Sequence, residues 1–107
     1  MDNKEVRVSQ GKPYTSYVGV SKEILKEKGQ VELHGLGEAS ANVVRAGEML
    51  VSLGYAELEK FETLTLSDKT ESGAPRSRAK VIIKLKKAPT FQKAYDEFNA
   101  TRGAKRD

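Results

Sequence analysis

The hydrophobic and polar positions of this chain change period several times, and each change marks a predicted element. Apolar and polar residues alternate over residues 5–9 and 31–34, which is the period of a half-buried strand. Helical spacing follows each of these runs, first from Pro13 to just before Gly29 and then over residues 38–53. The first half of the chain is therefore predicted to fold as strand, helix, strand, helix.

The second half of the chain is dominated by two long alternating runs. Residues 55–66 form the third predicted strand, and a phase change near residues 60–62 predicts a bulge or a late start of that strand. The fourth predicted strand runs through residues 79–87 and has apolar residues on one side only. A turn sequence at residues 71–75 lies between the two strands, which predicts a long hairpin with a basic, flexible tip.

Pro89 interrupts the fourth strand, and a short helix with one apolar side is expected after it. The tail from Thr101 to Asp107 is expected to be disordered and cationic. The elements together predict an α+β two-layer sandwich of order β-α-β-α-β-β. In this fold two helices cover one face of a mixed four-stranded sheet, and the short C-terminal helix is added at the end.

Length and composition limit the classes of function. A chain of 107 residues forms one domain with a modest core, and its net charge of +4 and pI near 9.3 favour an anionic partner. The absence of cysteine excludes disulfides and thiolate metal sites. No apolar run approaches the length of a membrane span, and the N-terminus has no signal-peptide pattern. We therefore expect a protein of the cytoplasm or nucleus with no membrane partner.

The strongest chemical bias lies in the stretch from Gly73 to Lys87. Six cations occur there with no acidic residue between them: Arg76, Arg78, Lys80, Lys84, Lys86 and Lys87. This pattern indicates a polyanion as partner. An edge strand that uses lysines to avoid aggregation explains the same pattern about equally well.

Catalytic chemistry has few candidates in this chain. His34 is the only histidine, it lies in a predicted strand, and no cysteine exists to pair with it, which excludes a Cys-His dyad and a multi-histidine metal site. The carboxylates between residues 57 and 71 are interpreted as solvating groups or as cross-strand partners of lysines. We therefore expect no enzyme, no metal, no cofactor and no small-molecule substrate.

Two weaker signals concern anion binding. The turn from Gly35 to Ala39 presents backbone N–H groups and the positive end of a helix dipole, which favour phosphate. It lacks the third glycine of a dinucleotide fingerprint, and Glu38 opposes an anion, so close packing of strand on helix is the favoured explanation. Lys12 lies in the loop after the first strand, which is predicted to neighbour this turn. Alone, Lys12 is equally explained as a solvated loop lysine.

The order of these motifs resembles the Alba family of small chromatin and RNA-binding proteins. The likeness rests on Gly11-Lys12-Pro13, on Gly35-Leu36-Gly37-Glu38-Ala39, on Gly73-Ala74-Pro75 and on Lys80-Val81-Ile82-Ile83. The resemblance implies a domain over residues 1–87, followed by the C-terminal helix and basic tail over residues 88–107. It also implies a dimer, either a homodimer or a heterodimer with a related chain, that binds RNA and double-stranded DNA. The residues that it assigns to nucleic-acid binding are Lys12, Gly37, Asn42, Arg76, Arg78 and Lys80.

Two departures from the archaeal pattern shift weight to the hairpin. Gly11 stands where archaeal members carry a second lysine, and Leu36 and Glu38 stand where they carry basic residues. This pattern is closer to plant and protozoan members, so RNA binding is expected to matter at least as much as DNA packaging.

The sequence therefore predicts non-enzymatic, largely sequence-independent binding of nucleic acid through a loop lysine, a helix N-terminus and a basic hairpin. The alternative is a protein-interaction subunit of a ribonucleoprotein such as a ribonuclease P-like particle, acting as one half of a heterodimer. An enzyme that acts on nucleic acid is a third, remote class.

Overall fold

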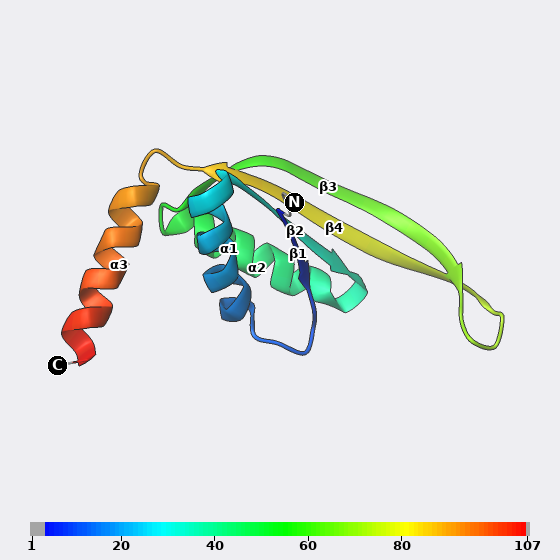
Figure 1. Cartoon of the computed structure of the whole chain (residues 1–107). Coiled ribbons are helices and arrows are strands. Elements are labelled where there is room, and N and C mark those ends of the chain that lie inside the picture. The colour runs from blue at the N-terminus through cyan, green and yellow to red at the C-terminus, as the bar shows by residue number, and fades with distance from the viewer. Residues whose placement is uncertain (1–3, 107) are drawn as a thin grey trace.

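The computed structural model describes residues 4–106, with side chains up to residue 99. Its elements follow the predicted order, and Figure 1 shows them along the chain. They are β1 (Glu5–Val8), α1 (Tyr14–Lys28), β2 (Gln30–Leu36), the 3₁₀ turn η1 (Gly37–Ala39), α2 (Ser40–Ser52), β3 (Ala56–Lys69), β4 (Pro75–Lys87) and α3 (Phe91–Arg106).

The four strands form one mixed sheet with the order β1-β2-β4-β3. β1 and β2 are parallel, and β4 is antiparallel to both β2 and β3. The α1 and α2 helices lie on the same face of this sheet (Figure 1). The predicted α+β sandwich is confirmed, because the two parallel strands are connected by a crossover helix and the last two strands form a hairpin.

The core fills the space between α1, α2 and the covered face of the sheet. Leu33 of β2 is opposite Ile83 of β4, and these two side chains and Leu25, Val43 and Leu50 of the helices are at most 5% exposed. These residues are the apolar positions of the alternating and helical runs. The hydrophobic pattern is therefore sufficient to determine the buried face of β1, β2, β4, α1 and α2, whereas the apolar residues of β3 after Ala56 stay largely exposed.

Gly35 explains why β2 and α2 approach so closely. A Cβ atom added to Gly35 would lie 2.4 Å from Val43 Cγ2 and 3.0 Å from the carbonyl oxygen of Ala39. The close packing that was favoured for this turn is thus confirmed at Gly35. The prediction that the second strand stops before Gly35 is wrong, because Gly35 pairs with Val8 on one side and with Val81 on the other.

The hairpin is longer than predicted. The register of β3 against β4 shifts between Leu58 and Lys60, which confirms an irregularity slightly before the predicted position. β2 last pairs with β4 at Lys80, so residues 65–79 form a two-stranded extension that no other strand joins. We call this extension the arm. Figure 1 shows it projecting from one end of the molecule, and the principal extents are 56 × 29 × 27 Å.

The C-terminal segment is one helix, not a short helix with a disordered tail. α3 has 16 residues and continues through Thr101 to Arg106, while Asp107 lies outside the described residues. Gly103 costs only about 1 kcal/mol in a helix, and the alanine, lysine and arginine around it are good helix formers. α3 is anchored by Phe91, which is fully buried against the ring of Tyr55. It lies at the end of the molecule away from the arm (Figure 1). In the described part of the chain, no helix is both long and apolar enough to cross a membrane.

Candidate nucleic-acid interface

The loop after β1 is fastened to the start of α2, as predicted for two neighbouring connections. Asn42 Nδ2 donates hydrogen bonds to the carbonyl oxygens of Ser9 (3.0 Å) and Lys12 (3.1 Å). Gly37 lies just before α2 and has φ +61°, a backbone conformation that favours glycine. We call Lys12, Gly37 and Asn42 the loop cluster. The sequence assigned all three to binding, and the structure brings them to one end of the sheet.

Asn42 holds the loop in place. A side-chain amide has two N–H groups, and both are used by the carbonyl oxygens of Ser9 and Lys12. Its remaining polar atom is an oxygen, which accepts hydrogen bonds and repels a phosphate. A direct contact from Asn42 to phosphate stays a prediction, whereas its contact with the loop is a feature of the structure.

Tyr17 is a second anchor of the same loop, and the sequence showed it only as an apolar helix position. The Ser9 backbone N–H donates to the Tyr17 hydroxyl oxygen at 2.9 Å, and the two hydroxyl groups lie 2.8 Å apart. The hydrogen bond with the Ser9 side chain outweighs burial and lowers the pKa of Tyr17. A tyrosine that alternates with smaller apolar residues on a helix face gives no sequence signal for this contact.

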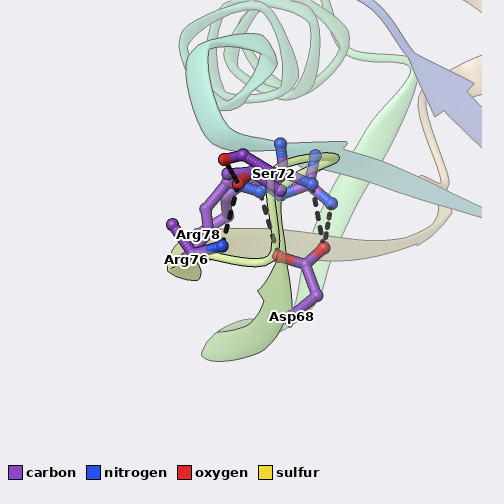
Figure 2. Close-up of polar contacts among 6 residues, drawn as sticks. Asp68, Ser72, Arg76 and Arg78 are labelled. Carbon is purple, nitrogen blue, oxygen red and sulfur yellow. Dashed lines mark hydrogen bonds and ion pairs between the residues drawn. The ribbon is translucent and has the colours of Figure 1, made fainter.

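The arm carries its cations in a different way, because they are paired with a carboxylate. Asp68 on β3 is opposite Arg76 on β4 and accepts two hydrogen bonds from it, from Nε at 2.9 Å and from Nη2 at 3.0 Å. Arg78 Nη2 donates a third hydrogen bond to Asp68 at 2.8 Å. Figure 2 shows the two guanidinium groups directed at the same carboxylate. The hydrogen bond from Arg76 is the main cause that lowers the pKa of Asp68 to about 2.

The tip of the arm has a defined turn. The N–H of Thr70 donates to the carbonyl oxygen of Ala74, and the N–H of Gly73 donates to that of Thr70, both at 2.9 Å. Gly73 has φ +86°, which the turn requires of it. The flexibility expected for the tip stays a prediction.

Carboxylates on β3 also face the basic residues of β4 inside the sheet. Glu62 lies 3.7 Å from Lys84 Nζ, and Glu57 lies 3.9 Å from Lys86 Nζ. The positive charge of β4 is therefore partly compensated by β3, although β4 itself has no acidic residue. The alternative of an ordinary edge strand is wrong for most of β4, because β4 lies between β2 and β3.

Lys12 and Lys80 are the assigned cations that remain available. Within residues 4–99, neither lysine makes an ion pair. Lys12 is exposed, and Lys80 is half-buried opposite Leu36, where the sheet ends and the arm begins. Lys80 therefore lies opposite the residue that precedes Gly37, at the point where the arm with its two arginines begins.

His34 is a strand side chain, as predicted, and it lies between two carboxylates. Its Nε2 atom is 3.2 Å from Glu5 and 3.1 Å from Glu32. In the described part of the chain, these three residues form the one group whose donor atoms are close enough to hold a metal ion. His34 forms a hydrogen bond with Glu32, and the Glu5 carboxylate lies within ion-pair distance of the same nitrogen atom.

An apolar groove lies on the helix-covered face, between α2 and the strands β3 and β4. It has a volume of about 320 Å³, and its floor includes Ile83 and Leu85. Val44, Val51, Leu58 and Phe61 line it, and each is 41–55% exposed. Large apolar side chains that gather in this way mark a binding surface on many proteins.

Comparisons with known proteins agree with this architecture. A family model described as Alba matches residues 4–68. An uncharacterized protein of Arabidopsis thaliana is 36% identical over 89 residues, which cover 82% of this chain and 68% of the relative.

Two solved structures have the same fold. The crystal structure of ALBA1 from Trypanosoma brucei matches with a TM-score of 0.79 and 28% identity, covering 96% of this chain and 85% of the other. Alba from Thermoplasma volcanium matches with a TM-score of 0.68 and 17% identity, covering 78% of this chain and 99% of the other.

Proposed function

Because this chain belongs to the Alba family, whose members generally bind nucleic acid and are generally not enzymes, we propose that it binds RNA and double-stranded DNA with little sequence specificity. The observation that carries the proposal is the placement of its cations. Lys12 is displayed beside the start of α2, Lys80 lies where the arm begins, and the arginines extend along the arm. Cations at the end of the sheet and along the arm suit an extended polyanion.

The chemistry of this surface favours phosphate over bases. Its donors are lysines, arginines and backbone N–H groups near a helix start, which contact the phosphate backbone in most complexes. The predicted binding residues include no aromatic side chain that would stack on a base. Affinity therefore arises from counterion release and falls steeply with salt.

In this proposal RNA is at least as important a target as DNA. Leu36 and Glu38 flank Gly37, so the start of α2 lacks added positive charge and Glu38 opposes an anion. The relatives from Arabidopsis thaliana and Trypanosoma brucei support a placement among plant and protozoan members. Direct comparison of RNA with DNA tests this part of the proposal.

A second copy of the chain occupies the apolar groove in this proposal. Val51 and Phe61 are 41% and 51% exposed, so an isolated monomer leaves large apolar area in water. A Phe61→Glu variant is expected to be monomeric in analytical ultracentrifugation while the wild type is dimeric. A wild type that stays monomeric and binds nucleic acid only with a related chain would favour the alternative, a heterodimeric ribonucleoprotein subunit.

The test of the function is a salt titration on matched duplex DNA, duplex RNA and single-stranded RNA. The wild type is expected to bind all sequences of one type alike, with log affinity falling linearly against log salt. Lys12→Ala should reduce the slope on duplex DNA by about 0.9, because one phosphate contact is lost. Lys93→Ala removes an exposed lysine from α3 and is the matched control, which should leave the slope unchanged. Equal effects of the two substitutions, or base-dependent affinity, would contradict the proposal.

A further inference from the structure

Asp68 is the residue of the arm that the proposed function leaves unexplained. A surface meant for phosphate carries a carboxylate between its two arginines, within 2.8–3.0 Å of three of their nitrogen atoms. A carboxylate presents two oxygens to a guanidinium much as a phosphate does. Asp68 therefore occupies donors that a phosphate would use.

Asp68 is charged at neutral pH. The arginine hydrogen bonds hold the pKa of Asp68 near 2, so it does not leave the arginines by taking up a proton at neutral pH. The net charge of Arg76, Arg78 and Asp68 together is one positive charge, not two. Any phosphate that approaches must displace this carboxylate or bind beside it, and either costs free energy that an unpaired guanidinium would not require.

Part of the donor capacity is still open. Each arginine has five N–H groups, and Arg78 commits only Nη2 to Asp68. Its Nε atom is covered and has no hydrogen-bond partner among the described residues. The arginines are thus held in place and partly neutralised, and the N–H groups that remain for a second acceptor are those other than the covered Nε of Arg78.

We propose that Asp68 limits the affinity of the arm, as an internal competitor that phosphate must overcome at Arg76 and Arg78. The inference rests on the proposed function, since it concerns the same surface. An equally simple structural role would be to hold the arginines in the geometry that phosphate needs. The two roles predict opposite signs for removal of the carboxylate charge.

The decisive variant is Asp68→Asn, measured for binding to duplex RNA and duplex DNA. Affinity is expected to rise about threefold to tenfold, and the salt slope on duplex DNA to steepen by about 0.9, because one more positive charge is free to neutralise phosphate. Asp68→Glu keeps the charge and is expected to bind like the wild type. Affinity of Asp68→Asn equal to or below that of the wild type would overturn the proposal and assign Asp68 a structural role.

A matched control separates local competition from net charge. Glu62→Gln also removes one carboxylate from β3, from a residue that pairs with Lys60 at 3.1 Å and Lys84 at 3.7 Å inside the sheet. It should raise affinity less than Asp68→Asn does. An equal gain from both variants would show a general charge effect and overturn the inference.

A mutant cycle tests whether Asp68 acts on affinity through Arg76 and Arg78. In the Arg76→Ala/Arg78→Ala background, the gain from Asp68→Asn should shrink to that of Glu62→Gln. An undiminished gain would overturn the inference.

Amide hydrogen exchange over residues 65–79 checks that the arm keeps its structure in each variant. Steep salt dependence of the wild type with no gain in Asp68→Asn would remove only this inference, whereas no binding by either protein would remove the proposed function as well.

Discussion

In the loop cluster, neutral hydrogen bonds hold the backbone around Lys12, and its ammonium group makes no ion pair with any described residue. In the arm, the cations themselves are held, because Arg76 and Arg78 share Asp68. The loop cluster is ordered without any loss of positive charge. The arm is ordered by an interaction that neutralises part of its charge, so the two regions should contribute differently to binding.

The reason for this difference lies in what stabilises each region. The loop cluster rests on the core, since Tyr17 and the start of α2 are packed against buried residues. The arm is a two-stranded ribbon beyond the last residue of β2, and such ribbons are marginally stable alone. The arm has no hydrophobic core, and cross-strand pairs such as Asp68 with Arg76 help to stabilise it instead.

The largest expected effect concerns stability, because the body of the molecule, meaning the sheet and helices outside the arm, has tight packing that the arm lacks. Gly35→Ala should lower the free energy of unfolding by roughly 2 kcal/mol, since the new Cβ would overlap Val43. Gly73→Ala in the arm meets no atom within 4 Å and should cost roughly 1 kcal/mol, from its positive φ alone. Denaturant unfolding of both variants checks this order. A larger loss for Gly73→Ala would mean that the arm and body unfold as one unit.

The next effect concerns affinity for nucleic acid, compared between a variant that lacks the two unpaired lysines and a variant that lacks the charged groups of the arm. Lys12→Ala/Lys80→Ala removes two free charges, so affinity should fall about tenfold and the slope on duplex DNA by about 1.8. Arg76→Ala/Arg78→Ala/Asp68→Asn removes one net charge and should cost about threefold, with a slope change of about 0.9. Both are measured by salt titration on the same duplex. Equal losses would show that Asp68 does not offset the arginines.

A smaller effect is expected at Asn42, which acts on the loop. Asn42→Ala removes two hydrogen bonds to the loop carbonyls, so Lys12 becomes less well placed and affinity should fall about twofold. When Lys12→Ala is already present, adding Asn42→Ala should cause little further loss, which a double-mutant cycle measures. Additive losses would instead support a direct contact from Asn42 to phosphate.

The smallest effect is a local acid transition of the arm. The pKa of Asp68 is lowered from 3.8 to about 2 in the folded protein, so its pairing stabilises the arm above pH 3.8 and is lost as the pH falls towards 2. NMR shifts of arm amides should follow this transition and stay constant at neutral pH. Asp68→Asn should abolish it, and a transition that persists there would point to another group.

Much of the fold could be predicted from periodicity. The alternating runs that became β1 and β4, and the helical spacing that became α1 and α2, each bury the face that the pattern indicates. The prediction failed where pattern is weak. β2 continued through Gly35 because neighbouring strands pair with it on both sides, and α3 continued past Thr101 although the tail lacks a regular apolar face.

The candidate site could be predicted only in part. Lys12, Arg76, Arg78 and Lys80 stand out as cations in loop and strand, and the expected meeting of the first loop with the second helix is confirmed by Asn42. The roles of Tyr17 and Asp68 could not be read, because their partners are eight to ten residues away along the chain.

The sequence by itself determined the order of the elements, the buried faces of β1, β2, β4, α1 and α2, and the family, because these depend on local periodicity and on motif order. Only the tertiary structure decided which charges are free. Strand register places Asp68 opposite Arg76, and Glu62 within reach of Lys84, while Lys80 at the root of the arm has no such partner among the described residues. An ion pair forms only between groups that lie within a few ångströms of each other. The pairing of two strands across a hairpin sets these distances, and no single run of residues specifies that pairing.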